Sequence, residues 1–482
     1  MLGSGGAGPR RPTLPMALLP IVLTLVLLAL QVFYYKDFTP HIPLAMGVAI
    51  TATLAWFRGY RWSDIESGCL HVVQVGLPSI AILMTVGMII AVWIASGTVP
   101  LLIYWGLNLL TPGVFLAAGM ILCAIVSVSL GTSWGTTGTI GLALMGIGSG
   151  FDIPMYWTAG AVVSGAFFGD KVSPLSDTTN LAPAVTDTNL FDHIRNLMPT
   201  TVPSMMISLV IYLLAGFFIT DSEQVDLSKI EAITTGLEQH FNFTPLLILP
   251  PALVIFLAAS KMPPLPSLFA GVFLGALLVI FLQGADLHTV FTYMQSGFSI
   301  DSGVAEIDAL LSRGGMQSMT WIITLVIIAL AFGGALESTH CLDTIMEAVL
   351  HRINSFFGLQ ASACGASVAT NLIAGDPYLS IALPGRMFSP AYVKLGYSKL
   401  NLSRSIEEGG TLISPLVPWN AGGAFVITAL GLGIAEGQTE NLLYIPLAFA
   451  CWLSPLIGLF YAWMGWFAPR ISDSNTPNTQ QS

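Results

Sequence analysis

Two stretches of this chain combine prolines with carboxyl, hydroxyl and amide side chains inside long apolar runs. The first, SGAFFGDKVSPLSDTTNLAPAV at 164–185, holds Asp170, Asp177 and Asn180. The second, SRSIEEGGTLISPLVPWNAGGAF at 403–425, repeats the Ser-Pro-Leu step of the first. Ionisable groups at membrane depth are costly, so they usually have a function. Two related, broken polar segments in the two halves of a membrane protein are typical of the binding site of a secondary transporter.

The side chains beside these prolines carry oxygen donors of the kind that hold a hard cation. A proline inside a helix removes a backbone hydrogen bond and kinks or breaks the helix, which frees carbonyl and amide groups for a ligand. Carboxylate, hydroxyl and amide oxygens suit Na⁺, and no His or Cys pattern indicates a transition metal. The residue types predict Na⁺ ligands at Asp170, Ser173, Asp177, Thr178 and Asn180. For any single hydroxyl, capping a half-helix or bonding across the helix bundle is an equally good interpretation.

Further residues extend this candidate site. Asp376 and Glu408, in the second half of the chain, are the other carboxylates that we expect to bind an ion or a proton. Lys171 follows Asp170, and three roles for it stay open: neutralising Asp177, holding an organic anion, or replacing a cation in the empty carrier. The residues expected along the substrate pathway are Thr132, Ser133, Thr136, Lys171, Ser173, Ser176, Thr178, Thr179, Asn180, Thr370, Asn371, Thr411, Ser414 and Asn420.

The composition places these residues in a membrane. The chain has 482 residues, of which 54% are hydrophobic and 9% charged, whereas about 25% of residues are charged in a typical soluble domain. Apolar windows long enough to span a bilayer recur without period-two alternation, which favours helices over barrel strands. They predict an all-α polytopic membrane protein with about 10 to 12 crossings and with broken or re-entrant helices at the midplane. The net charge of −10 argues against a nucleic-acid partner.

The two polar stretches also predict two inverted repeats. When the two halves of the chain are aligned with each other, Gly131–Gly138 falls opposite Ala369–Asp376. Short cytoplasmic loops are rich in Lys and Arg. If the second repeat is inverted, Lys36, Lys229 and Arg313 are the only basic residues of the chain that lie on the outer side of the membrane. We therefore expect both termini in the cytoplasm, below a bacterial-type inner membrane. The expected segments are a cytoplasmic N-terminal segment at 1–14, repeat one at 15–221, an external linker at 222–243, repeat two at 244–467 and a disordered tail at 468–482.

Five segments of the chain resemble the NhaC-type sodium/proton antiporters, which belong to the ion transporter superfamily of inverted-repeat carriers. The segments are GTSWGTTGTIG at 131–141, SGAFFGDKVSPLSDTTNLAPAV at 164–185, DHIRNLMPTTVPS at 192–204, GDPYLSIALPGRMFSPAY at 375–392 and NLSRSIEEGGTLISPLVPWN at 401–420. Two segments depart from the family pattern: Glu407-Glu408-Gly409-Gly410-Thr411 replaces Glu-Asp-Ser-Gly-Thr, and Pro377 replaces Gln. The resemblance implies exchange of cytoplasmic Na⁺ for external H⁺.

Three hypotheses follow from these observations. The leading one is a Na⁺/H⁺ antiporter in which the two ions compete for carboxylates at Asp170, Asp177 and Asp376. The alternative is an organic-anion antiporter of the malate/lactate type coupled to Na⁺ or H⁺, which Lys171 and Arg386 keep open. An intramembrane aspartyl protease is disfavoured by the many hydroxyls and by the lack of Tyr-Asp and Gly-x-Gly-Asp motifs. The expected partners are Na⁺, H⁺ and the lipid bilayer. We expect no cofactor, and the choice between a monomer and a homodimer stays open.

Overall fold

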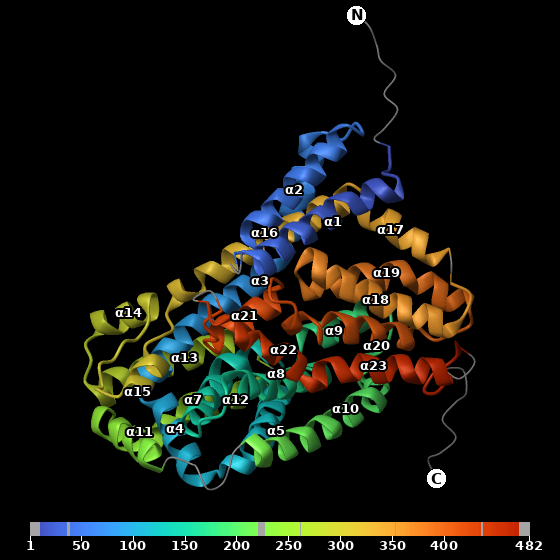
Figure 1. The fold of residues 1–482 in the computed structure, drawn as a ribbon. Helices are drawn as coiled ribbons and strands as arrows, with labels where there is room; N and C mark the ends of the chain where they lie inside the picture. Colours follow the sequence, from blue (N-terminus) through green and yellow to red (C-terminus); the bar gives the residue numbers. More distant parts are fainter. Residues whose placement is uncertain are drawn as a thin grey trace, which may run out of the picture.

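The fold is built of helices, which Figure 1 draws as coiled ribbons. The computed structural model describes residues 10–35, 39–219, 227–260, 262–351, 353–434 and 437–471. Within these ranges the regular elements are helices, and the one isolated bridge pairs Tyr397 with Arg470. The prediction of an all-α polytopic membrane protein is confirmed.

The helices of the first half run from the N-terminal segment to the long helix α10. They are α1 Leu14–Ala29, α2 His41–Trp56, α3 Trp62–Ala95, α4 Thr98–Leu109, α5 Pro112–Leu130, α6 Ser133–Thr136, α7 Leu142–Gly150, α8 Met155–Val172, α9 Asp177–Thr186 and α10 Leu190–Ile219. Two π-helical turns interrupt this series, η1 Leu30–Tyr34 and η2 Thr137–Gly141.

The second half contains shorter elements beside its long helices. The α-helices are α11 Leu227–His240, α12 Leu249–Ala259, α13 Pro264–Gln283, α14 Leu287–Ser296, α15 Ala305–Leu311, α16 Thr320–Ser338, α17 Cys341–Leu350, α18 Phe356–Ala374, α19 Pro377–Lys394, α20 Lys399–Gly410, α21 Ala421–Ala429, α22 Tyr444–Leu447 and α23 Phe449–Met464. The 3₁₀ turns are η3 Pro245–Ile248, η4 Met316–Met319, η5 Ser414–Leu416 and η6 Thr439–Leu443.

Fewer helices than expected are long and apolar enough to cross a membrane. Among the described residues there are six, or eight if each of two bent pairs counts as one span. The bent pairs are Lys229–His240 with Pro245–Ala259, at 101°, and Thr439–Leu447 with Phe449–Met464, at 41°. The difference from ten to twelve arises because other apolar runs form helices of 10–17 residues, namely Leu14–Ala29, His41–Trp56 and Thr98–Leu109. Broken and short helices are therefore more frequent than the hydropathy of the sequence predicts.

The segment expected as the external linker contains helix α11. Ile233 and Leu237, four residues apart, bury one face of this helix, and Lys229 forms an ion pair with Asp152. Residues 222–226 of that linker lie outside the described residues, as do Lys36 and the tail at 472–482. Residues 1–9 of the expected cytoplasmic segment lie outside them too.

The same backbone geometry occurs once in each half. Helix α5 ends at Gly131 with φ 67°, and α18 ends at Gly375 with φ 63°, a left-handed conformation that favours glycine. Thr132 and Asp376 follow with an extended backbone, and each side chain caps the next helix. The backbone geometry pairs Gly131 with Gly375, whereas the sequence alignment pairs Gly131 with Ala369, six residues earlier. The recurrence supports the proposal of two repeats.

Close contact between α5 and α8 fixes the position of the first broken stretch. A side chain at Gly165 would place its Cβ 2.1 Å from the Met120 carbonyl oxygen, and one at Gly169 would lie 2.6 Å from that of Ala124. Small residues let helix backbones approach in this way. The Ser127 hydroxyl donates to the Ala166 carbonyl at 2.5 Å across the same interface. Helix α8 therefore carries Asp170 on a tightly packed support.

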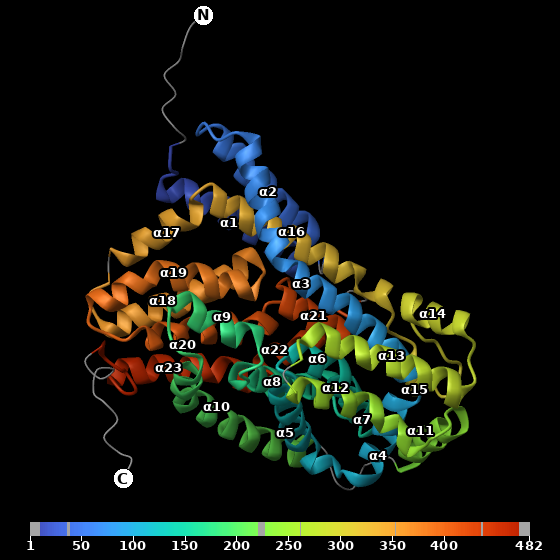
Figure 2. The same cartoon turned by 180° about the vertical axis from the view of Figure 1, so that it is seen from behind.

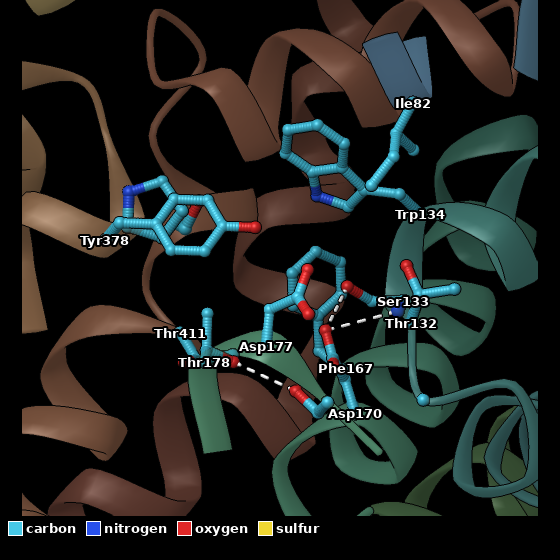
Figure 3. A pocket seen from close by; sticks show the side chains of 14 residues that line it. Ile82, Thr132, Ser133, Trp134, Phe167, Asp170, Asp177, Thr178, Tyr378 and Thr411 are labelled. Carbon is cyan, nitrogen blue, oxygen red and sulfur yellow. Dashed lines mark hydrogen bonds between the residues drawn. The ribbon is translucent and has the colours of Figure 1, made fainter. Parts of the chain in front are cut away.

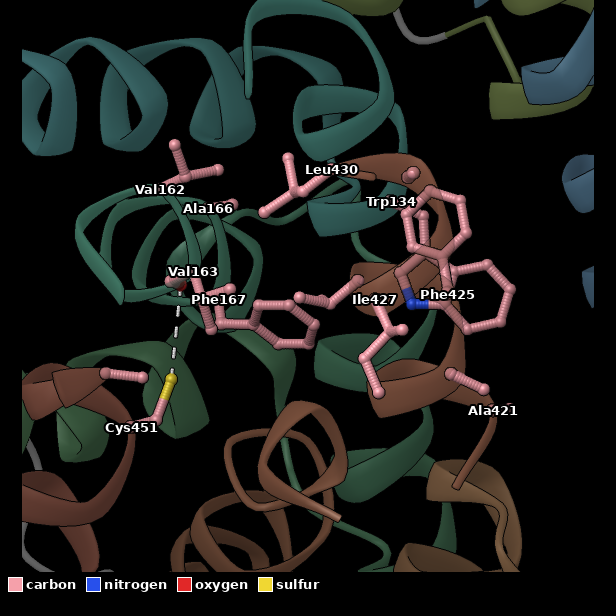
Figure 4. Packing of buried hydrophobic residues seen from close by; sticks show 14 of the residues in the cluster. Trp134, Val162, Val163, Ala166, Phe167, Ala421, Phe425, Ile427, Leu430 and Cys451 are labelled. Carbon is pink, nitrogen blue, oxygen red and sulfur yellow. Dashed lines mark hydrogen bonds between the residues drawn. The ribbon is translucent and has the colours of Figure 1, made fainter. Parts of the chain in front are cut away.

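The two halves meet in one packed core. Both ribbon views place α18, α19, α20 and α23 side by side, with α9 against α19 and α20 (Figures 1 and 2). The Trp134 ring stacks on Phe425 with 5.2 Å between ring centroids, next to Phe167 of α8 and Ile427 of α21 (Figure 4). This apolar layer lies directly beside the polar cavity described below, because Trp134 and Phe167 contribute to both.

Candidate functional site

A cavity lies where the polar stretches of the two halves come together (Figure 3). Its empty volume is about 440 Å³, counted with the space open to solvent. The predicted site residues that line it are Thr132, Ser133, Asp170, Ser176, Asp177, Thr178, Thr411 and Ser414. Thus α6, α8, α9 and the segment after α20 each contribute oxygen donors to one small space.

Asp170 is held by the start of helix α6. Its Oδ2 accepts a 3.1 Å hydrogen bond from the Ser133 backbone N–H and a 2.6 Å bond from the Ser133 hydroxyl (Figure 3). The first N–H groups of a helix have no partner within the helix and favour a negative charge. The side chain of Asp170 is only 8% exposed. Asp170 is therefore a fixed carboxylate in a nearly closed place.

Asp177 faces the same cavity from the first turn of α9. Ser176 begins that helix, and its hydroxyl accepts from the Thr179 backbone N–H at 3.4 Å. Asp177 is exposed, whereas Thr178 beside it is buried. The Tyr378 hydroxyl points toward Asp177 from the opposite wall (Figure 3). The cavity thus has one enclosed carboxylate and one at its open side.

The donor set of the cavity fits a hard monovalent cation. The lining has two carboxylates, several hydroxyls and, among the described residues, no Lys, Arg or His. Oxygen donors of this type suit Na⁺. No cluster of three or more His, Cys, Asp or Glu side chains occurs in the described part of the chain. The electrostatic environment of the cavity therefore favours a positive ion over an anion.

Lys171 lies behind the cavity and is paired. Its Nζ is 3.3 Å from Oε1 of Glu408 and donates to the Ser454 hydroxyl at 2.7 Å. Thr200 donates to the same Glu408 oxygen at 2.5 Å. The side chains of Lys171 and Glu408 are 0% and 2% exposed. In this structure the carboxylate partner of Lys171 is therefore Glu408, whereas Asp177 lies in the cavity.

Two of the five predicted Na⁺ ligands stabilise the break between α8 and α9. The Ser173 hydroxyl donates to the Val128 carbonyl at 2.8 Å. The Asn180 amide donates to the carbonyls of Pro174 and Ser176 at 2.9 and 2.7 Å. Ser173 thus ties the break to the last turn of α5, and Asn180 bonds to carbonyls of the break itself. Asp170, Asp177 and Thr178 are the predicted ligands that line the cavity.

Several other predicted residues cap helices or bond to the backbone. The Asp376 carboxylate accepts from the Leu379 backbone N–H at 2.8 Å and begins helix α19. Thr136 and Thr370 donate to carbonyls four residues earlier in the chain. The Thr179 hydroxyl donates to the Asp170 carbonyl at 2.9 Å. Of these contacts, the Thr179 bond joins α9 to the end of α8, and the others are local to one helix.

Asn371 and Asn420 join the second broken stretch to α18. The Asn371 amide donates to the carbonyls of Gly409 and Gly410 at 2.8 and 2.7 Å. Asn420 donates to the side-chain oxygen of Asn371 at 2.8 Å and accepts from the Ser414 hydroxyl at 2.5 Å. The side-chain amides of Asn371 and Asn420 thus hold the irregular segment after α20 in place.

Two further groups lie next to the cavity, and neither was among the predicted site residues. Glu407 is fully buried, and its Oε1 accepts from the Thr411 hydroxyl at 2.8 Å. Tyr378 contributes the phenol on the opposite wall. The sequence held a signal for both: Glu407 precedes Glu408 in an acidic pair, and Tyr378 lies two residues after Asp376. The direction of each side chain depends on how α19 and α20 pack, which the sequence does not show.

Comparison with known proteins shows the family of the chain. A model of the Na⁺/H⁺ antiporter family matches residues 165–466. The chain is 40% identical to the Na⁺/H⁺ antiporter NhaC of Alkalihalophilus pseudofirmus, over 95% of this chain and 96% of that protein. It is 37% identical to the arginine/ornithine antiporter ArcD of Halobacterium salinarum, over 95% and 93% of the two chains. It is 33% identical to the malate-2H⁺/Na⁺-lactate antiporter of Bacillus subtilis, over 95% and 96%. The chain belongs to the Na⁺/H⁺ antiporter family.

Proposed function

We propose that this protein exchanges cytoplasmic Na⁺ for external H⁺ by alternating access in a bacterial-type inner membrane. The observation that carries the proposal is the cavity lined by Asp170 and Asp177 and by no described basic side chain. Two relatives that match nearly the whole chain bear other substrates in their names, so the chemistry of the cavity is the deciding argument. That chemistry favours a small cation.

In this mechanism Na⁺ and H⁺ compete for the same carboxylates. A proton on Asp170 or Asp177 removes a negative oxygen ligand, so a protonated site binds Na⁺ weakly. Na⁺ in the site in turn repels a proton. Ser133 holds the Asp170 carboxylate in one orientation through two hydrogen bonds. The carboxylate is therefore already oriented before Na⁺ or H⁺ binds.

The cost of an empty site couples the two fluxes. Two ionised carboxylates without a counter-ion are expensive to enclose in a nonpolar protein interior. The carrier therefore reorients when the site holds Na⁺ or protons and reorients slowly when it is empty. A proton gradient directed inward then drives Na⁺ outward. Two inverted repeats, with both termini in the cytoplasm, would supply the two equivalent conformations.

The organic-anion alternative has less support in the geometry. Lys171 is paired with Glu408, and Arg386 lies 3.3 Å from Glu337. Neither basic side chain lines the cavity. Among the described residues that line the cavity, none supplies the cationic group that would hold a carboxylate substrate such as malate or lactate.

Transport in proteoliposomes distinguishes these functions. The purified protein is reconstituted with a pH dye inside, a proton gradient is imposed, and Na⁺, Li⁺, K⁺, malate, lactate, arginine and ornithine are added separately. We expect Na⁺ alone to collapse the gradient. Asp170→Asn should abolish the response, while Asp192→Asn, on the exposed start of α10, should keep it. A response that requires an organic substrate would contradict the proposal.

A further inference from the structure

The wall of the cavity opposite Asp177 carries a phenol that the exchange described above does not use. Tyr378, at the start of helix α19, lines the cavity, and its hydroxyl points across the space toward the Asp177 carboxylate (Figure 3). Asp177 is exposed and Tyr378 is half-buried, so the two residues stand at the open side of the cavity. An ion that enters there passes between a carboxylate and a phenol.

The backbone around Tyr378 fixes where its ring begins. Gly375 turns the chain with a left-handed φ of 63°. The Asp376 carboxylate then caps α19 by accepting from the Leu379 backbone N–H at 2.8 Å. Pro377 occupies the first position of the helix, where its fixed φ suits the first turn. A ligand on such a constrained turn can move little, and the flexibility of the ligands is one of the properties that decide which cation a site prefers.

A second hydroxyl near the phenol lacks a hydrogen-bond partner. Ser79 of α3 is 2% exposed, and its hydroxyl has no such partner in the part of the chain that the structure describes. It interacts with the Tyr378 hydroxyl, but the geometry between them is not that of a hydrogen bond. Buried polar groups in folded proteins nearly always have a partner. The Ser79 oxygen is therefore available as an acceptor after a small shift of either side chain.

The two neighbours of the phenol allow it two hydrogen-bonding arrangements. A tyrosine hydroxyl has one proton to donate and lone pairs that accept. In this structure the hydroxyl points toward Asp177. When a cation binds at Asp177, the phenol proton turns to the Ser79 oxygen, and the lone pairs of the phenol oxygen then face the cation. The cation thereby gains a neutral oxygen ligand from α19 in addition to the charged ligand from α9.

We propose that Tyr378 is a specificity-determining residue of the carrier. Its phenol oxygen replaces a water ligand of Na⁺ at the open side of the cavity, and Ser79 accepts the phenol proton. This inference rests on the proposed function, because it takes Na⁺ as the ion that binds at Asp177. Coulomb attraction falls with distance, so a small alkali cation gains more from a close, fixed oxygen than a larger one does. The cavity therefore prefers Na⁺ and Li⁺ to K⁺.

Binding of radioactive Na⁺ to the purified full-length protein in detergent tests the proposal, with unlabelled NaCl, LiCl and KCl as competitors. We expect the wild type to bind Na⁺ more tightly than K⁺. Tyr378→Phe keeps the ring and deletes the oxygen, so Na⁺ affinity should fall about tenfold, as for one lost contact to a charged group, while K⁺ affinity changes little. Ser79→Ala should cause a smaller loss. In the Tyr378→Phe background it should cause no further loss, because the two hydroxyls act as a unit.

A tyrosine away from the cavity gives the matched control. Tyr293 of α14 is half-buried and packs on Phe298 with 5.1 Å between ring centroids, and Tyr293→Phe should bind Na⁺ as the wild type does. If the wild type binds Na⁺ and Tyr378→Phe retains both its affinity and its preference over K⁺, the inference is wrong while the proposed function stands. A wild type that binds no Na⁺ would overturn both. Losses that simply add in the double variant would overturn the part assigned to Ser79.

Discussion

At the scale of single residues, the polar centre divides into the cavity with Asp170 and Asp177 and the Lys171–Glu408 ion pair behind it. Asp170 and Asp177 face the cavity, while Lys171, next to Asp170 in the sequence, turns to Glu408. Adjacent residues of a helix point in different directions. The cavity therefore keeps its negative charge, and the buried lysine connects α8 to α20 instead.

Removing one member of the Lys171–Glu408 ion pair should strongly destabilise the protein. Lys171→Met leaves Glu408 buried without its counter-charge, and we expect a loss of about 3 to 5 kcal/mol of stability. Lys171→Met combined with Glu408→Gln removes both charges and should recover most of that loss. Thermal unfolding of the purified variants in detergent measures both. Arg11→Gln, in the exposed pair with Glu347, should have little effect. A double variant as unstable as the single one would contradict this role.

The sequence predicted the residue types of the site but not all their partners. The oxygen-rich stretch around Asp170 indicated a cation site because charged groups at membrane depth are energetically costly and usually have a function. The partner of Lys171 could not be predicted, since Glu408 lies 237 residues away and contact depends on packing. Ser173 and Asn180 have the same residue types as cation ligands, yet they bind backbone carbonyls. Only the direction of a side chain separates these two uses.

At the scale of elements, glycines decide how closely the site helices approach. Gly165 of α8 contacts the α5 backbone, whereas a Cβ at Gly365 of α18 would meet nothing within 4 Å. The left-handed glycines Gly131 and Gly375 end α5 and α18 and turn the chain toward the cavity. The structure thus gives these glycines two different tasks: Gly165 allows close packing, and Gly131 and Gly375 reverse the chain.

Alanine substitution separates the glycine tasks. Gly165→Ala forces α5 and α8 apart, because its Cβ would lie 2.1 Å from a backbone oxygen, and we expect it to cost about 1 to 3 kcal/mol. Gly365→Ala, in an exposed helix position, should be neutral or stabilising by up to about 1 kcal/mol. Thermal unfolding and proton exchange are measured for both. Equal behaviour of the two variants would show that close packing of α5 on α8 is unimportant.

At the scale of the whole molecule, the hydropathy of the sequence predicted a helical membrane protein and overestimated its regular crossings. The long apolar helices are those with at most two charged residues in their apolar window, such as α3, α13 and α16. The broken segments could not be counted from hydropathy, because apolar runs also form half-helices and bent pairs. The inverted repeat and the orientation in the membrane stay predictions.

Thiol labelling tests the orientation. Asp301→Cys, before α15, is exposed and predicted outside, while Lys394→Cys, at the end of α19, is exposed and predicted inside. In a background without the five native cysteines, an impermeant thiol reagent added to whole cells should label the first and not the second. Labelling of the second after the membrane is opened shows that it is reactive. Labelling of both in intact cells would rule out the inverted arrangement.

Proton release on Na⁺ binding tests most directly whether the two ions compete for the cavity carboxylates. Purified protein in weakly buffered detergent solution receives NaCl, with choline chloride as the control, and a pH dye records released protons while radioactive Na⁺ records binding. The competition predicts that Na⁺ releases protons from the wild type, that choline releases none, and that Asp170→Asn combined with Asp177→Asn abolishes both Na⁺ binding and proton release. Na⁺ binding to the wild type without proton release at any pH, from acid to alkaline, would contradict it.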